Sequence, residues 1–335
     1  MHRYFLILFV ATVLLPVTKC LAQDSTDYYN RALDFIRTKD YDNAIIVLNK
    51  GLEEKPGNSL LKKQLAFCYY FQDNNSKALE LLKPLIDNNL ADDQCYQIVG
   101  NIYRESGQGA ELEKLFRKGI QQFPENGALY NEMGNVLWEQ HNNDAISYWE
   151  RGIEEDPNYS KNYYNATRYY NLKGDWLWTI VYGELFITLE CFSPKTSEIK
   201  EVVLGAYKKY FLQGKNEAFQ KYTKGFAQAC TDKLFKQAAI TKNGITTSSL
   251  MMIRTRFVLD WFNGPYKKFP FRLFEFHRDL LRLGMFEAYN QWLFGSTENL
   301  NQFQNWVQMN NNIYNTFIKG LQSGKFSLPA KQYYH

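Results

Sequence analysis

The 335-residue sequence predicts an all-helical protein, in which an array of two-helix hairpins is followed by a second helical region. Three observations support this prediction. A small residue recurs every 34 positions, at Ala32, Ala66, Gly100 and Gly134. The apolar residues around each of these positions follow the spacing of one helix face. Glycine and proline are sparse and lie between the periodic segments, which favours helices over strands.

The clearest hairpin runs from Tyr130 to Pro157. Met133 and Leu137 fall on one face of its first helix and Trp149 falls on its second helix, so these side chains can fill the space between the helices. Gly134 is small where we expect the two helices to approach each other closely. The proline at the end of the range cannot continue a helix and separates this hairpin from the next. Because one hairpin cannot bury its apolar face alone, we expect neighbouring hairpins to stack.

The same skeleton continues through five units between Ser25 and Pro194, and it resembles the tetratricopeptide repeat family over about half of the chain. The match is specific in units one, three and four, and it is weakest in unit five, which begins at Tyr163. The resemblance implies an α-solenoid, a right-handed superhelix in which the first helix of each unit lines a concave face. It also implies that an extended peptide or a partner helix binds on that face.

The resemblance assigns the concave face to a set of polar and aromatic residues on the first helices. A side-chain amide both donates and accepts hydrogen bonds, so a series of asparagines can pair with an extended backbone of any sequence. The aromatic rings can stack on a flat or apolar group, and the arginines can bind a carboxylate. The predicted groove residues are Asn101, Arg104, Asn131, Asn135, Trp138, Tyr164, Arg168 and Asn171.

A second interpretation of these residues stays open. Exposed asparagines on a helix are commonly only solvated, and Trp138 and Tyr164 can instead pack against neighbouring helices. Family members that clamp a carboxyl terminus use lysines together with asparagines, and lysines are missing from the central part of the predicted groove. The sequence therefore predicts a groove for a peptide or protein partner without assigning the carboxylate-clamp mode.

The first 22 residues have the pattern of a secretory signal. A short basic start precedes the apolar run Phe5–Leu15, which is too short to span a bilayer. We expect cleavage near Ala22 and export to the periplasm or cell envelope of a Gram-negative bacterium, where such repeat proteins are common. Lipidation of Cys20 and an uncleaved anchor are the alternatives, and Lys19 disfavours lipidation because lipidation sites require a small residue at that position.

Residues 196–335 keep a helical period without the repeat, so we expect a tetratricopeptide array over 25–194 and a separate all-helical domain of unrecognised family after it. The chain from Ser323 onward is predicted to be frayed. The expected helices are Ser197–Leu212, Asn216–Ala238, Thr247–Phe262, Phe269–Leu283, Met285–Phe294 and Leu300–Leu321.

The most apolar part of this region, residues 269–294, also carries several basic residues. A basic amphipathic helix can lie on a membrane surface. More commonly the apolar stripe is core and the basic residues are its solvated face, and this is the interpretation we favour here.

The sequence contains little that indicates chemistry. His277, Arg278 and Asp279 spell the catalytic tripeptide of protein kinases, but no glycine-rich loop accompanies them. Cys230 and His277 are a thiol and an imidazole with no local motif around them. No phosphate-binding loop, dinucleotide fingerprint, zinc motif or nucleic-acid module is present, so we expect neither a cofactor nor a metal nor a nucleic-acid partner.

The sequence therefore predicts a non-enzymatic adaptor or scaffold of the cell envelope that binds a peptide or partner protein on the concave face of its repeats. The alternative is that residues 196–335 form an enzyme or ligand-binding domain for which the repeats serve as a docking arm.

Overall fold

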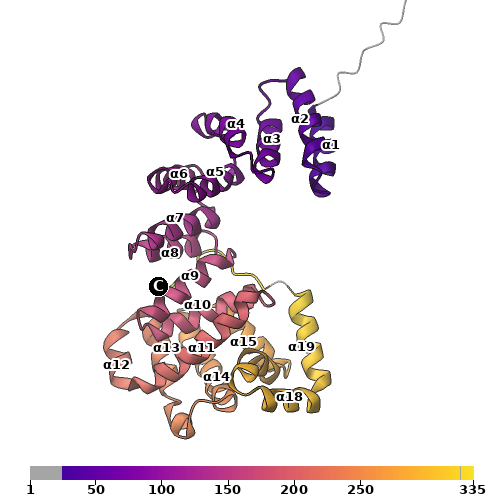
Figure 1. Ribbon diagram of the computed structural model, residues 1–335. Coiled ribbons are helices and arrows are strands. Elements are labelled where there is room, and N and C mark those ends of the chain that lie inside the picture. The colour runs from indigo at the N-terminus through magenta and orange to yellow at the C-terminus, as the bar shows by residue number, and fades with distance from the viewer. Residues whose placement is uncertain (1–24, 325) are drawn as a thin grey trace, which may run out of the picture. The chain divides into compact units, whose positions relative to one another are not determined.

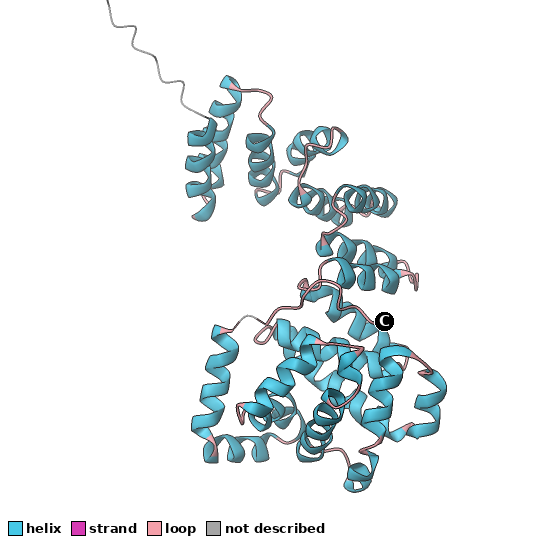
Figure 2. Cartoon of the chain, turned by 180° about the vertical axis from the view of Figure 1, so that it is seen from behind, coloured by secondary structure: helices cyan, strands magenta, loops and turns pink. Residues whose placement is uncertain are grey.

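The computed structural model describes residues 25–324 and 326–335, so the predicted signal segment and the Cys20 alternative lie outside the described residues. Within the described part, every regular element is helical (Figure 2), which confirms the predicted all-α class. The chain divides into two compact units, one ending at Ile102 and the other beginning at Tyr103.

The first unit holds two complete hairpins that pack side by side. The second helix of hairpin one lies against the first helix of hairpin two. Tyr28, Leu48 and Leu61 are fully buried at this contact, and Ala32, the first small residue of the 34-residue series, is buried beside them. The helices of this unit are α1 (Ser25–Arg37), α2 (Tyr41–Glu54), α3 (Ser59–Phe71), α4 (Asn75–Asp87) and α5 (Asp93–Glu105), the last of which contains the division between the units.

Side-chain caps explain where these helices begin. Asp40, Asn58 and Asn74 each accept a hydrogen bond from a backbone N–H in the first turn of the helix that follows. Such a cap satisfies one of the four N–H groups that a helix start leaves without an internal partner. The five predicted helix–turn–helix units are confirmed as the hairpins α1–α2, α3–α4, α5–α6, α7–α8 and α9–α10.

The second unit begins with the later hairpins, which also pack against their neighbours in sequence. The predicted close approach at Gly134 is present. A Cβ built on this glycine would meet the indole nitrogen of Trp149 and would lie 2.6 Å from the indole Cδ1. The helices are α6 (Gly109–Gln122), α7 (Gly127–Glu139), α8 (Ala145–Glu155), α9 (Ser160–Leu172) and α10 (Trp176–Leu189).

The C-terminal helices surround α10. Every residue of α10 from Leu177 to Thr188 is buried, because α9 and α11 cover two sides and the later helices cover the rest (Figure 1). The remaining elements are α11 (Pro194–Leu212), α12 (Gly214–Lys221), α13 (Gly225–Phe235), α14 (Thr247–Phe262), α15 (Arg272–Arg282), α16 (Phe286–Asn290), α17 (Ser296–Glu298), α18 (Leu300–Met309) and α19 (Asn311–Ser323), with 3₁₀ turns at Ala238–Asn243 and Pro265–Lys267 and a π-helical turn at Gln291–Gly295.

Hairpin α9–α10 and the C-terminal helices share one apolar core, which runs from Ile153 to Leu328 in sequence. The division of the chain into domains at residues 194–196 stays a prediction. The aromatic rings of hairpin five, such as Tyr163, Trp178 and Tyr182, belong to this shared core.

Two predicted C-terminal helices are interrupted. The range 216–238 is broken after Lys221, and the second helix starts at Gly225, whose φ of 73° favours glycine. The range 300–321 is broken at Asn310, whose side-chain amide donates to the carbonyl of Trp306 at 2.9 Å. In both places, local backbone chemistry ends a helix although the apolar period continues.

The apolar stripe of residues 269–294 is core. Phe271, Phe274, Leu280, Phe286 and Trp292 are all buried. In the part of the chain that the structure describes, none of the helices is long and apolar enough to cross a bilayer.

We expect Gly134→Ala to lower the free energy of unfolding by about 2–3 kcal/mol, because the added methyl group overlaps the indole of Trp149. The matched control is Gly205→Ala in α11, where an added Cβ meets nothing within 4 Å and helix propensity adds up to about 1 kcal/mol of stability. Urea denaturation followed by circular dichroism measures both effects. A Gly134→Ala chain as stable as the wild type would contradict the close approach.

Candidate functional site

A surface hollow of about 250 Å³ is lined by residues of α7, α8, α9 and α11, and we call it the α9 hollow. Three predicted groove residues, Trp138, Arg168 and Asn171, line it. The other lining residues are Trp149, Asn165, Tyr169, Leu172, Glu198 and Val202.

One wall of the α9 hollow is aromatic. The ring of Trp138 lies 5.9 Å from that of Trp149 and 5.8 Å from that of Tyr169, in tilted and edge-on arrangements. Trp149 is held in place because its indole N–H donates to the backbone carbonyl of Asn131 at 3.4 Å. Trp138 remains half-buried and keeps part of its ring available to the hollow.

The opposite wall is charged. Arg168 on α9 has its Nε 3.8 Å from Oε1 of Glu198 on α11, and its guanidinium carbon lies 5.4 Å from the centre of the Tyr164 ring. Tyr164 is buried, and its hydroxyl donates to Oε2 of Glu198 at 3.0 Å. Burial and this hydrogen bond raise the pKa of Tyr164, so its hydroxyl stays protonated and continues to donate. Tyr164 thus positions Glu198 and does not itself line the hollow.

The predicted asparagines are joined to each other by a residue that the sequence prediction missed. The side-chain amide of Asn165 lies 2.9 Å from Oδ1 of Asn131 and 2.9 Å from Oδ1 of Asn135. Asn131 is buried, whereas Asn135 and Asn165 are half-buried. Repeat spacing does not lead to it, because α7 and α9 begin 33 residues apart, at Gly127 and Ser160, so the repeat equivalent of Asn131 is Tyr164 and Asn165 comes one residue later.

The two remaining predicted residues do not line the α9 hollow. Asn101, in the first unit, has its side-chain nitrogen 3.3 Å from the hydroxyl of Tyr70. Arg104 donates to Oε2 of Glu132 at 2.7 Å, and Oε1 of Glu132 accepts from Asn131 at 3.2 Å. The groove role of all eight residues stays a prediction, and the structure brings three of them together.

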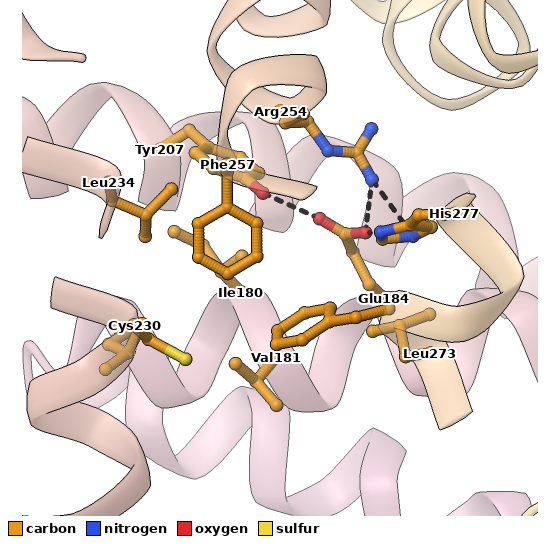
Figure 3. A pocket seen from close by; sticks show the side chains of 12 residues that line it. Ile180, Val181, Glu184, Tyr207, Cys230, Leu234, Arg254, Phe257, Leu273 and His277 are labelled. Atoms are coloured by element: carbon orange, nitrogen blue, oxygen red, sulfur yellow. Dashed lines mark hydrogen bonds and ion pairs between the residues drawn. The ribbon is translucent and has the colours of Figure 1, made fainter. Parts of the chain in front are cut away.

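A group of polar side chains is buried among the C-terminal helices (Figure 3), and we call it the Glu184 cluster. Glu184 on α10 accepts from Arg254 at 2.5 Å and from the hydroxyl of Tyr207 at 2.8 Å. Nε2 of His277 lies 3.4 Å from Glu184 and 3.4 Å from Arg254. Arg254 also donates to Asn290. Four helices, α10, α11, α14 and α15, therefore meet at one carboxylate.

The charges in the Glu184 cluster are set by burial and by each other. Burial alone would raise the pKa of Glu184, but the Arg254 guanidinium holds it below its usual value, so the carboxylate stays ionised. Burial lowers the pKa of His277, and Arg254 opposes its protonation as well. The imidazole is therefore neutral at pH 7, and its Nε2 faces both Glu184 and Arg254.

The cavity beside this cluster has a volume of about 30 Å³, which has room for about two water molecules and for no organic substrate. Cys230 and His277 both line it. Burial raises the pKa of the Cys230 thiol well above its usual value, so the sulfur is a protonated thiol and a poor nucleophile. The cluster therefore has the character of a structural network.

Comparison with known proteins gives one family match. Residues 35–102 match the family model described as tetratricopeptide repeat. Similar solved structures include MamA (21% identity, TM-score 0.42, covering 50% of this chain and 92% of that one), pilF of Pseudomonas aeruginosa (13%, 0.49, 61% and 94%) and YrrB, titled a TPR protein with an unusual peptide-binding site (16%, 0.40, 56% and 93%). No curated protein matches the chain in sequence.

We expect the stability of the wild-type chain to fall as the pH drops below 6.5, because the unfolded chain binds a proton at His277 that the folded chain excludes. A group with a lowered pKa contributes its stability fully above the unfolded value and loses it as pH falls toward the folded value. Between pH 7.5 and 5.5, His277→Gln should therefore lose about 1 kcal/mol less than the wild type.

The control for this measurement is His141→Asn. His141 is exposed in the turn before α8, where a φ of 59° suits asparagine. Urea denaturation at both pH values should give this control the same pH dependence as the wild type. Equal pH dependence for His277→Gln and the wild type would show that His277 is not held neutral.

Proposed function

We propose that this chain, a tetratricopeptide repeat protein, is a non-enzymatic scaffold that binds a peptide segment of a partner protein in the α9 hollow. One observation carries the proposal. A single hollow combines an aromatic wall at Trp138 and Tyr169 with amide and charged groups at Asn165, Asn171 and Arg168. Peptide recognition needs both, because rings bury an apolar side chain while amides pair with the backbone.

The size of the α9 hollow suits a peptide better than a small substrate. Its volume of about 250 Å³ holds one or two side chains, and it is smaller than typical small-molecule sites of about 300–1,000 Å³. We infer that an apolar or aromatic side chain of the partner inserts beside Trp138. A polar or basic neighbour of that side chain would then lie beside Glu198, which is about half exposed.

The non-enzymatic part of the proposal is supported by the chemistry of the Glu184 cluster. Its cavity of about 30 Å³ is too small for an organic substrate, and the Cys230 thiol beside it is protonated. The alternative of an enzyme or ligand-binding domain in residues 196–335 gains no support from this cluster.

We further propose that the partner is a protein of the bacterial cell envelope. The support for this location is the signal-like pattern of residues 1–22, with its short apolar run. The export proposal stands apart from the binding proposal, and fractionation of cells that express the full chain tests it.

The experiment for the binding proposal is site-specific photo-crosslinking. A photoreactive amino acid replaces Asn171 inside the α9 hollow, and in the control it replaces Leu212, which is 86% exposed and does not line the hollow. Mass spectrometry then identifies a partner that is cross-linked from position 171 and not from position 212.

The affinity of that purified partner is measured for Arg168→Glu and Trp138→Ala. We expect each substitution to weaken binding at least ten-fold, since aromatic and arginine anchors dominate most interfaces. Arg168 is exposed, so its substitution leaves the fold intact and serves as the check on Trp138→Ala. Unchanged affinity for both variants would contradict binding in the α9 hollow.

A further inference from the structure

The segment Phe326–His335, which the sequence predicts to be frayed, lies against the helices of the second unit as a bound peptide does. It has no helix of its own. It returns from the end of α19 to α8, α9 and α10 (Figure 1), and the last residue contacts side chains from all three helices. We call this segment the tail and the surface beneath it the tail site.

The first anchor of the tail is Leu328. The side chain of Asn158, which lies between α8 and α9, accepts from the backbone N–H of Leu328 at 2.8 Å and donates to its carbonyl at 2.9 Å. The Leu328 side chain is buried. Two-point pairing of an amide side chain with one residue of an extended backbone is a general way to hold a peptide without reading its sequence.

The second anchor is aromatic. The ring of Tyr334 stacks on Phe226 of α13, with centres 5.0 Å apart and planes inclined by 12°. The Tyr334 hydroxyl donates to the carbonyl of Pro270 at 2.7 Å. Close by, the backbone N–H of Arg272 donates to the side chain of Gln332 at 2.8 Å.

The third anchor is His335. Its ring lies edge-on to that of Trp178, with the ring centres 4.5 Å apart. Its Nδ1 lies 3.1 Å from Oε1 of Glu150, and its Nε2 lies 2.9 Å from the hydroxyl of Tyr170. Oε1 of Glu150 also accepts from the hydroxyls of Tyr170 and Tyr182. Glu150 is therefore a mostly buried carboxylate, fixed by two tyrosines, that faces a ring nitrogen from the tail.

Between the anchors the tail is exposed. Pro329, Ala330 and Lys331 face solvent, so the tail is held by a few side chains and by no regular element. Release of such a segment breaks no helix and is a local opening. It would leave Asn158 and Glu150 with polar groups that a peptide can satisfy again.

We propose that the tail site is a second peptide-binding site, occupied in this chain by its own tail and open to a partner peptide of the same pattern. That pattern is an apolar residue followed six and seven positions later by tyrosine and histidine. The tail site and the α9 hollow both touch α8 and α9, but Asn158, Phe226 and Glu150, which hold the tail, do not line the hollow, so the two sites are distinct. The tail is part of the same chain, so its effective concentration at the tail site is on the order of millimolar. A partner peptide therefore binds when the affinity of the tail for the site is lowered.

The test uses the full chain and a fluorescent peptide with the sequence of residues 326–335. Fluorescence anisotropy measures its affinity for the wild type, for Leu328→Ser/His335→Ala and for the control Ala330→Ser, which alters an exposed tail residue. We expect the double variant to bind the peptide at least ten-fold more tightly than the wild type and the control. Adding Asn158→Ala to the double variant should remove that gain.

Equal peptide affinity for the wild type and the double variant would overturn the proposal, as would a gain that survives Asn158→Ala. If the double variant melts early, His335→Ala alone carries the same test, because that side chain is 31% exposed. Gel filtration accompanies each measurement. If the double variant forms a dimer that the free peptide does not dissociate, the proposal is overturned. The tail site would then be occupied by a second copy of the chain.

Discussion

The ion pair between Glu184 and Arg254 is the constraint around which the second unit is built. Both side chains are only 3% exposed, and an ionised carboxylate at such depth requires a partner and further hydrogen bonds. Arg254 supplies the charge, while Tyr207 and His277 supply the remaining contacts. Removal of one member of a buried pair typically costs about 3–5 kcal/mol, because the other charge remains without compensation. This requirement fixes α11, α14 and α15 around α10.

The same constraint explains why α10 differs from the second helices of the earlier hairpins. A repeat helix normally buries one face and exposes another, as α8 does with Trp149 inside and Arg151 outside. In α10 the outer face is also apolar, and Glu184 is buried within it. Hairpin α9–α10 is thus both the last repeat and the inner layer of the C-terminal helices. Its position makes α9 a shared wall, since Arg168 and Asn171 line the α9 hollow and Tyr170 contacts the tail.

The eight predicted groove residues show what repeat arithmetic can and cannot locate. Trp138, Arg168 and Asn171 meet in one hollow because equivalent positions on stacked helices face the same way. Asn131 and Tyr164 have the right sequence positions but are buried, since the helix surface that faces a neighbour depends on how closely the two helices approach. Asn165 lies one residue beyond Tyr164, the repeat equivalent of Asn131, so the repeat spacing did not indicate it. The docking of the tail could not be found from the sequence either, because its anchors at Asn158, Phe226 and Glu150 are 108 or more residues away in sequence.

The sequence by itself determined the helical class, the five hairpins and the close approach at Gly134, because period, small residues and helix-ending prolines act over short distances along the chain. Tertiary structure alone decided that hairpin five shares its core with the C-terminal helices, that Glu184 meets Arg254 across 70 residues, and that the tail is docked. These outcomes depend on contacts between distant segments. The free energy of these contacts comes from burial and charge pairing, and neither produces a periodic pattern in the sequence.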